Sequence, residues 1–180
     1  MMAIQENFIK MKAKPLPPLE ELKEFLDYNP DTGIFTWKKQ KAKKTKVGEN
    51  AGRTTTKNYF TIKFNYIEYQ VHRLAYYMYH GIDPLEKIVD HIDGDKTNNK
   101  INNLRLATVS QNGMNRVGLA SNNTSGATGV RWYEKIKKWS ARISIDGVET
   151  SLGYFTKKED AIQARKEAEI KYYGDFRRKN

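Results

Sequence analysis

The feature that most restricts how this chain can fold is VGLASNNTSGAT, a stretch of small and polar residues at positions 117–128. This composition is typical of a linker between domains and cannot supply a buried core. It divides the 180 residues into two parts, each long enough for one small core. We therefore predict an N-terminal tail with a short helix at 1–24, a domain at 25–116, the linker at 117–128 and a second domain at 129–180.

The hydrophobic pattern before the linker predicts short, alternating elements. Leu19, Leu22, Phe25 and Leu26 have the spacing of an amphipathic helix. After a turn signal at 29–33, strands are expected at Ile34–Trp37, over 59–65 and at Ile67–Gln70, with a tight turn at Asn65-Tyr66. A helix follows from Val71 and ends at Gly81.

The pattern after the linker predicts three strands and one helix. The strands are expected over 129–133, 139–145 and 148–153. Thr156 and Glu159 have the spacing of a capping box, which places the start of the helix there. The buried stripe of this helix is predicted at Ala161, Ala164, Ala168 and Tyr172, and Gly174 is the expected stop.

Charge and composition narrow the classes of function. The formal net charge is +11, which suits a polyanionic partner because Lys and Arg release condensed counterions when they bind phosphates. Six lysines fall between Lys38 and Lys46; they form either a solvated loop or a phosphate-contacting one, with Lys41, Lys43 and Lys44 as the predicted contacts. The absence of cysteine excludes a disulfide scaffold and a cysteine-ligated zinc site. No apolar run has the length of a membrane span, so we expect a cytoplasmic protein without a membrane partner.

The segment VDHIDGDKTNNKINNLRLATVSQN at 89–112 carries the residues suited to chemistry. We predict a strand at Ile88–His91, a polar loop, a second strand at Leu104–Ala107 and then a helix. Thr108 and Gln111 form a capping box at the start of that helix. This order would bring Asp90, His91 and Asn112 around one point.

These residue types suit the hydrolysis of a phosphodiester. Asp90 offers an anionic oxygen and Asn112 a neutral one, which fits one Mg²⁺ or Mn²⁺ ion with water and phosphate oxygens as further ligands. His91 could take the proton from the attacking water, because an unperturbed imidazole titrates near neutral pH. Each residue alone is weak evidence, since an adjacent Asp and His are more often exposed surface residues without a catalytic role. Their combination supports the prediction.

Three further residues have open roles. His72 either packs structurally at the start of its helix or contacts the site or the DNA. Asn115 would replace Asn112 as a ligand if the helix register shifted. Arg116 could hold a phosphate.

The central segment resembles the HNH endonucleases common in phages, including free-standing homing endonucleases. The likeness is carried by VHRLAYYMYHG and by residues 89–112, and it covers roughly 25–116. It implies a ββα-metal fold with one catalytic divalent ion, in which His91 matches the general base and Asp90 and Asn112 the metal ligands. Asn103 matches the middle Asn, which orders the loop. The third position is Asn rather than His.

The C-terminal segment resembles the plant ethylene-response-factor (AP-two type) DNA-binding domain, through GVRW, WSARI, LGYF and the helix pattern over 125–176. The likeness implies a three-stranded antiparallel sheet packed on one helix, with the sheet in the major groove. Arg131 matches a base-contacting arginine. Trp132, Tyr133, Lys138 and Arg142 lie on or beside the same strands, although packing in the core is an alternative for the tryptophans. Thr128, Ser144 and Ser151 stand where plant domains carry Arg or Trp, so the target sequence cannot be transferred.

Taken together, the sequence predicts a two-module α+β protein. Its HNH half would hydrolyse DNA in a metal-dependent reaction, by nicking or by double-strand cleavage, and its C-terminal half would give site preference. The expected partner is double-stranded DNA, and the expected assembly is a monomer or weak dimer. The alternative is a non-catalytic DNA-binding regulator with a degenerate site. A nuclease acting on RNA or on a particular nucleic-acid structure is a third possibility.

Overall fold

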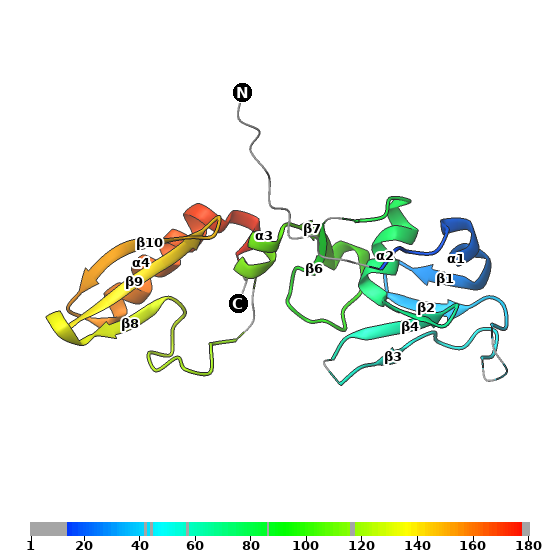
Figure 1. Ribbon diagram of the computed structural model, residues 1–180, viewed down its shortest axis with the longest axis horizontal. Coiled ribbons are helices and arrows are strands. Elements are labelled where there is room, and N and C mark those ends of the chain that lie inside the picture. The colour runs from blue at the N-terminus through cyan, green and yellow to red at the C-terminus, as the bar shows by residue number, and fades with distance from the viewer. Residues whose placement is uncertain are drawn as a thin grey trace, which may run out of the picture. The chain divides into compact units, whose positions relative to one another are not determined.

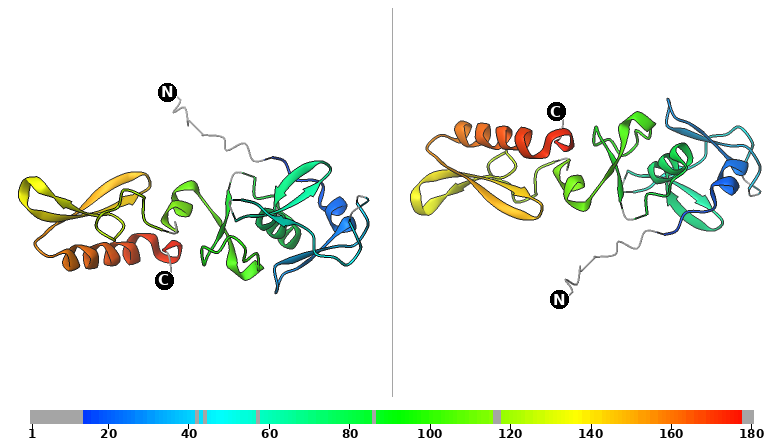
Figure 2. Two further views of the ribbon diagram at one scale, coloured as in Figure 1. Left: turned by 90° about the horizontal axis from the view of Figure 1, so that it is seen from below. Right: turned by 90° about the horizontal axis from the view of Figure 1, so that it is seen from above.

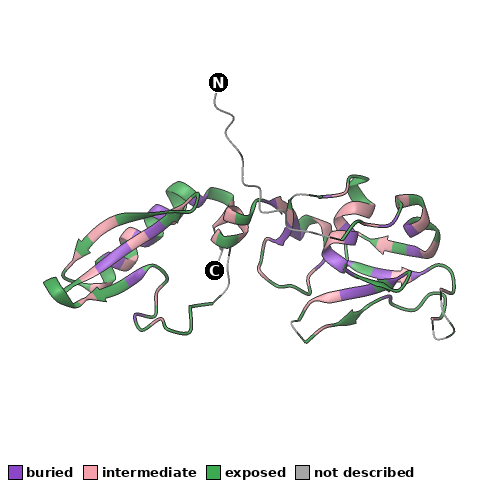
Figure 3. Cartoon of the chain, in the orientation of Figure 1, coloured by how far each residue is buried: buried purple, intermediate pink, exposed green. Residues whose placement is uncertain are grey.

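The computed structural model describes residues 14–177 apart from 42, 44, 57, 86, 116 and 117. The chain divides into two compact units, Met1–His91 with Asp95–Leu106 and Ile92–Gly94 with Ala107–Asn180. Figure 3 shows buried positions in both units, so each has its own core. Within the described part of the chain, none of the helices combines the length and apolar character that crossing a membrane requires.

The first unit begins with a short helix and a hairpin. Helix α1 (Leu19–Phe25) ends because Leu26 adopts an extended backbone and starts strand β1 (Leu26–Asn29), so the prediction that Leu26 is helical is wrong. Strand β1 pairs antiparallel with β2 (Ile34–Trp37), and Leu26 lies opposite Trp37. Asn29 forms the turn between them: its Oδ1 accepts the backbone N–H groups of Asp31 and Thr32, both at 3.0 Å.

A three-stranded antiparallel sheet follows, in the order β3 (Arg53–Thr54), β4 (Phe60–Phe64), β5 (Ile67–Gln70). The predicted turn between β4 and β5 is confirmed, because Asn65 and Tyr66 both have positive φ, 48° and 63°, as a two-residue hairpin turn requires. Strand β5 leads directly into helix α2 (Val71–His80), whose end at a left-handed Gly81 was also predicted.

The core of the first unit lies between these elements (Figure 1). Helix α2 contacts α1 and strands β4, β5 and β6. Its apolar positions are buried because they recur at helical spacing on one side. The buried residues of this core are Leu22, Leu26, Phe35, Trp37, Ala51, Ile62, Phe64, Tyr69, Val71, Leu74, Ala75, Val89 and Leu104.

The segment predicted to carry the chemistry follows the expected order. Strand β6 (Ile88–His91) and strand β7 (Leu104–Ala107) form a two-stranded sheet, and a 3₁₀ turn (Ile101–Asn103) precedes β7. Helix α3 (Val109–Met114) then begins with the predicted capping box: Thr108 Oγ1 accepts the N–H of Gln111, and Gln111 Oε1 accepts the N–H of Thr108. This helix belongs to the second compact unit, whereas the sequence placed the domain end at 116.

The rest of the second unit is an antiparallel sheet and a helix (Figures 1 and 2). The strand order is β10 (Val148–Phe155), β9 (Lys138–Ile145), β8 (Val130–Tyr133), and β10 has an irregularity between Ser151 and Gly153. Helix α4 (Lys158–Tyr173) packs against all three strands. Short 3₁₀ turns occupy Glu134–Ile136 and Gly174–Phe176.

Helix α4 corrects two details of the prediction. It starts at Lys158 with Lys157 as N-cap and no side-chain capping bond, so the capping box of Thr156 and Glu159 does not form. Tyr172 is exposed and Tyr173 is buried instead. The second error has a physical cause: Arg165, one position after Ala164, faces the sheet, and the buried face turns with it.

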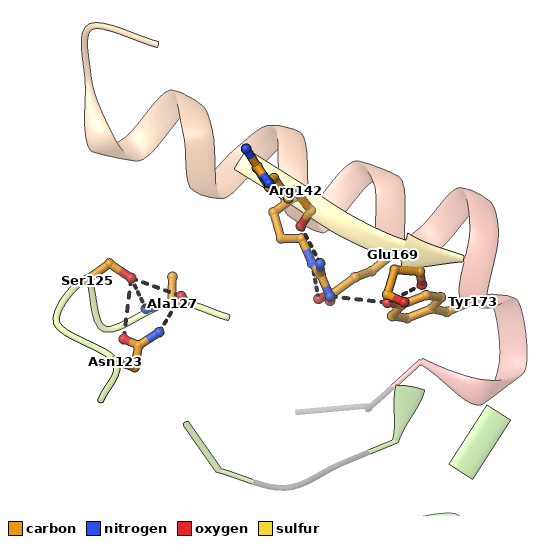
Figure 4. Close-up of polar contacts among 8 residues, drawn as sticks. Asn123, Ser125, Ala127, Arg142, Glu169 and Tyr173 are labelled. Atoms are coloured by element: carbon orange, nitrogen blue, oxygen red, sulfur yellow. Dashed lines mark hydrogen bonds and ion pairs between the residues drawn. The ribbon is translucent and has the colours of Figure 1, made fainter. Parts of the chain in front are cut away.

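Arg165 is buried because its guanidinium finds polar partners inside the unit, among them Arg142 and Glu169, which Figure 4 labels. It donates to the backbone oxygen of Arg142 on β9 and, through Nε, to Glu169 Oε1 at 2.8 Å. Tyr173 donates to the backbone oxygen of Ser144 at 2.9 Å. These bonds fix α4 to the middle strand beside an apolar cluster of Ile143, Ala168 and Tyr173, with Met114 of α3, Ile145 and Leu152 packed against it.

The predicted linker contains a structured loop. Asn123 Oδ1 accepts the N–H of Gly126 at 2.7 Å, and Asn123 Nδ2 and Ser125 Oγ donate to the backbone oxygen of Ala127, both at 2.9 Å (Figure 4). Ser125 is buried. These bonds hold the backbone of residues 123–127 in one shape just before β8.

Candidate functional site

Strand β6 carries Asp90 and His91, the two predicted site residues that are adjacent in sequence. Their exposed fractions are only 8% and 5%. A buried carboxylate needs a partner, because removal from water destabilises its charge. Arg105 on β7 provides that partner: its Nε and Nη2 both donate to Asp90 Oδ2, at 3.0 and 2.9 Å. Sequence reasoning missed Arg105, although a charge between Leu104 and Leu106 in a short apolar strand was an available signal.

The imidazole of His91 contacts a second residue that sequence reasoning missed. His91 Nε2 lies 3.1 Å from Asn99 Oδ1. An amide oxygen can only accept, so Nε2 donates in this contact and the neutral ring has its lone pair on Nδ1. The pairing fixes both the tautomer and the orientation of the ring. No local pattern distinguishes Asn99 from the other asparagines of the loop.

Asn99 is itself held from both sides. Its Nδ2 donates to the backbone oxygen of Thr97 at 3.1 Å, and its own backbone oxygen accepts from the Tyr28 hydroxyl at 2.8 Å. Burial raises the pKa of Tyr28, so this hydroxyl stays protonated and able to donate. The N–H of Ile101 also donates to the backbone oxygen of Pro30 at 3.0 Å. The first hairpin thus supports the polar loop between β6 and β7.

Asn103 is buried at the end of this loop. Its Nδ2 donates to the backbone oxygen of Asn98 at 2.8 Å. Asp95 closes the opposite part of the loop, since its Oδ1 accepts the N–H and the hydroxyl of Thr97, at 2.9 and 2.7 Å. The predicted role of Asn103 in ordering the loop has the contact with Asn98 as its physical basis.

His72 lies at the start of α2 and packs against the site. Its ring meets that of His91 edge to face at 4.9 Å and that of Tyr59 at 5.7 Å. Burial, followed by the nearby His91 and Arg73, lowers the pKa of His72 to about 3. His72 is therefore neutral at physiological pH, and its surroundings are those of a packed aromatic ring.

The remaining site predictions fall in or near α3, in the second unit. Asn112 is half-buried on the helix, and Asn115 is buried at its C-cap. Arg116 lies outside the described residues. No group of three or more His, Cys, Asp or Glu side chains within the described ranges could hold a metal ion. The predicted ligands, Asp90 and Asn112, are one carboxylate and one amide, and oxygen donors of both kinds are ligands that Mg²⁺ and Mn²⁺ accept in proteins.

The lysine-rich loop contains side chains in different environments. Lys41 Nζ lies 4.0 Å from the ring centre of Phe25 and 4.2 Å from that of Phe64, and 3.7 Å from Glu21 Oε1. Lys43 is exposed, and Lys44 lies outside the described residues. Lys41 is thus engaged within the first unit, which leaves Lys43 as the more accessible cation.

The C-terminal sheet has one polar face and one packed face. Side chains directly opposite in an antiparallel pair share a face. Arg131 lies opposite Ser140, and Ser140 opposite Tyr154, while Tyr133 lies opposite Lys138. Arg142 follows Ser140 by two residues and joins the same face, which we name the polar face: Arg131, Tyr133, Lys138, Ser140, Arg142 and Tyr154.

The two arginine side chains of the polar face differ in whether they have an ion-pair partner. Arg142 Nη1 donates to Glu149 Oε2 at 2.6 Å, and the bond to Glu149 raises its pKa. The Arg131 side chain is exposed and has no ion pair or hydrogen bond among the residues that the structure describes. A hollow of about 240 Å³ lies beside both arginines and is also lined by the loop at 122–124.

Trp132 lies on the opposite face from Arg131. Its ring meets that of Trp139 edge to face at 5.4 Å, and its Nε1 donates to Glu134 Oε2 at 2.6 Å. Trp139 also packs against the cluster of Val130, Ala141 and Ala161 beneath α4. The two tryptophans therefore border the packed face.

The chain was compared with proteins of known family. Residues 69–114, which include Asp90, His91, Asn103 and Asn112, match the family model described as HNH endonuclease. Protein 3.8 of Escherichia phage T7 is 34% identical over 67 residues, which cover 37% of this chain and 54% of that protein. The uncharacterized HNH endonuclease L560 of Acanthamoeba polyphaga mimivirus is 29% identical over 121 residues, which cover 67% of this chain and 62% of that protein.

The chain thus matches between about half and two thirds of the length of these relatives. A solved structure on DNA binding and cleavage by the HNH homing endonuclease I-HmuI aligns with 86% of this chain and 87% of its own, with 22% identity and a TM-score of 0.44. The family match contains the four predicted site residues in order and spans the segment from the end of β5 to α3. Residues 69–114 are therefore similar to the HNH endonuclease family.

Proposed function

We propose that this protein is a DNA endonuclease that requires a divalent metal ion and uses its C-terminal unit to select where it cuts. The observation that carries the proposal is the pair on β6: a buried carboxylate and a buried, oriented imidazole stand side by side within the segment that matches the HNH family. A binding protein has no evident need to bury and orient both groups.

Each residue has a definite task in this proposal. Asp90 would hold the metal ion, with Asn112 as the second predicted ligand. An ion held there would stabilise negative charge on the phosphate and on the leaving oxygen. His91 Nδ1 would accept the proton of the attacking water, because Asn99 occupies Nε2. Asn103 and Asn99 would keep the loop, and therefore the ring, in place.

Cleavage of supercoiled plasmid tests the catalytic half. The full chain should nick or linearise the plasmid with Mg²⁺ or Mn²⁺ and not with EDTA. His91→Ala should lower the rate by about 10²–10⁴-fold with little change in DNA affinity, because a general base contributes to the rate and little to binding. Asn99→Ala should lower it less, since the imidazole stays. Cleavage by His91→Ala at the wild-type rate would disprove the site.

The polar face of the C-terminal sheet is the proposed DNA-reading surface. It has two arginines, a lysine and two tyrosines on one side of the strands, with α4 on the other side. A sheet of this kind can enter the major groove, where arginine donates to guanine O6 and N7. Arg131 is the proposed base contact because its guanidinium is exposed. Lys43 would contact phosphates.

The plasmid assay also separates this proposal from the alternative of a non-catalytic regulator. A regulator would bind DNA through the same cationic surfaces and leave the plasmid intact with every metal ion tried. Gel-shift titrations on the same samples would show binding in that case, so binding without cleavage would favour the regulator.

A further inference from the structure

The only carboxylate proposed as a metal ligand is already paired with a cation. Arg105 places two N–H donors on Asp90 Oδ2, and the two side chains are 14% and 9% exposed. Most of the other described ion pairs are far more exposed; Lys46 and Glu49, for example, are 79% and 55% exposed. Salt and water screen a buried pair much less than an exposed one. The positive charge of Arg105 is therefore felt strongly at Asp90.

This charge opposes the binding of a second cation. Mg²⁺ in nucleic-acid enzymes is usually held by one or two carboxylates together with the phosphates of the substrate. Here the guanidinium of Arg105 offsets the charge of the Asp90 carboxylate, so the free protein attracts a divalent ion to Asp90 less strongly than an unpaired carboxylate would. The next acidic residues of the loop are Asp93 and Asp95, both exposed, and Asp95 Oδ1 already accepts from Thr97.

We infer that Arg105 makes metal binding at Asp90 dependent on DNA. In the free protein the guanidinium neutralises the carboxylate, and a DNA phosphate at the site supplies the negative charge that a divalent ion needs. The inference rests on the proposed function, because it takes Asp90 as a metal ligand. Arg105 is a positioning and charge-setting residue in this scheme. The enzyme would bind its ion together with its substrate.

Binding of Mn²⁺ without DNA tests the inference directly. Free Mn²⁺ is measured by electron paramagnetic resonance in titrations of the full chain. Arg105→Gln, which removes the charge and keeps a donor, should bind Mn²⁺ on the order of tenfold more tightly than wild type. Arg105→Lys keeps the charge and should bind like wild type. Equal or weaker binding by Arg105→Gln overturns the inference, because Arg105 would then only orient Asp90.

Two controls separate the possible failures. Arg73→Gln removes another partly buried pair, Arg73 with Asp83 at 2.9 Å, and should leave Mn²⁺ affinity unchanged. Asp90→Asn added to Arg105→Gln should abolish the tighter Mn²⁺ binding. If the double variant binds Mn²⁺ as tightly as Arg105→Gln alone, Asp90 is not the ligand and the proposed function fails in that respect. If Asp90 proves to be the ligand but Arg105→Gln binds Mn²⁺ no more tightly than wild type, only the inference about Arg105 is wrong.

A second measurement avoids any change at Arg105, in case its variants do not fold. In a His91→Ala background, which prevents turnover, a DNA duplex should tighten Mn²⁺ binding. By linkage, saturating Mn²⁺ must then tighten DNA binding by the same factor. Asp90→Asn should remove this coupling. A DNA affinity that does not respond to Mn²⁺ overturns the inference.

Discussion

The rings of His72 and His91 meet edge to face with their centres 4.9 Å apart. The His91 ring is thus positioned by two contacts. Its Nε2 is hydrogen-bonded to Asn99, and the ring packs edge to face against that of His72. A protonated His72 would bring a positive charge into this buried contact. The arrangement therefore requires a neutral His72, which makes the stability of the fold depend on pH.

The first prediction concerns that dependence. The pKa of His72 is lowered from 6.5 to about 3 in the folded protein. Between these values the unfolded chain binds the proton more readily, so this contribution to stability is complete above about pH 6.5 and declines as the pH falls toward 3. Each pH unit removes up to about 1.4 kcal/mol. Urea unfolding of wild type and His72→Phe at pH 7.5, 6.5 and 5.5 measures how the free energy of unfolding changes with pH.

Other groups also titrate in this range, so the comparison between the two proteins carries the test. Wild type should lose more unfolding free energy than His72→Phe between pH 6.5 and 5.5. Parallel losses would mean that His72 is already accessible to protons in the folded state.

The second prediction concerns the contact between the first hairpin and the loop of the site. Gly33 has φ +74°, and a Cβ there would lie 2.5 Å from the carbonyl carbon of Asn99 and 2.6 Å from the nitrogen of Lys100. Gly33→Ala should therefore lower both stability and cleavage rate, because it pushes on the backbone that holds Asn99. Thermal unfolding and plasmid cleavage measure the two effects.

Gly48→Ala is the matched control for this change. Gly48 has φ +83°, but a Cβ there would have nothing within 4 Å. The left-handed conformation alone should cost about 1 kcal/mol at each position. A cleavage rate that falls equally in both variants would argue against a role for the Gly33 contact in the site.

The third prediction concerns reading by the C-terminal sheet. Arg131→Ala should weaken binding to the preferred site by about 1–3 kcal/mol and relax the preference at one base pair. Lys166→Ala removes the same charge from the exposed side of α4 and should weaken binding to all sequences slightly. Mapping of cleavage sites for both variants distinguishes them. An unchanged map for Arg131→Ala would exclude Arg131 as a base contact.

The fourth prediction separates two lysines of one loop. Lys43→Ala should weaken DNA binding and reduce the slope of log affinity against log salt by about 0.9, as one lost phosphate contact does. Lys41→Ala should instead lower stability by about 1 kcal/mol, because Lys41 lies over Phe25 and Phe64. Salt-dependent gel shifts and urea unfolding measure the two. The reverse assignment would show that Lys41 leaves its aromatic contacts when DNA binds.

Local pattern predicted most elements of this chain. Alternation over 59–65 predicted β4, and Asn65 is a residue type that tolerates the positive φ of the turn after it. The errors arose at residues whose conformation or burial depends on a partner that is distant in the sequence. Leu26 leaves the helix because it pairs with Trp37, and Arg165 is buried because a carbonyl on β9 accepts from it.

The candidate site shows the same division between local and distant information. Asp90, His91, Asn103 and Asn112 stand in a recognisable order along the chain, so the sequence alone suffices to propose them as site residues. Arg105 and Asn99 act on Asp90 and His91 from across the two-stranded sheet and from the loop. Their roles depend on side-chain geometry that no spacing rule contains.

The bond from Tyr28 to the backbone of Asn99 also bears on how the matched segment could be transferred to another protein. The family match begins at residue 69, yet the loop that orients His91 is supported by a hairpin at 26–37. A graft of the matched segment onto another scaffold would leave that loop without its support. We therefore expect the smallest transplantable segment to begin before Leu26, because chains joined at the motif border would keep the predicted site residues and lose the support of their loop.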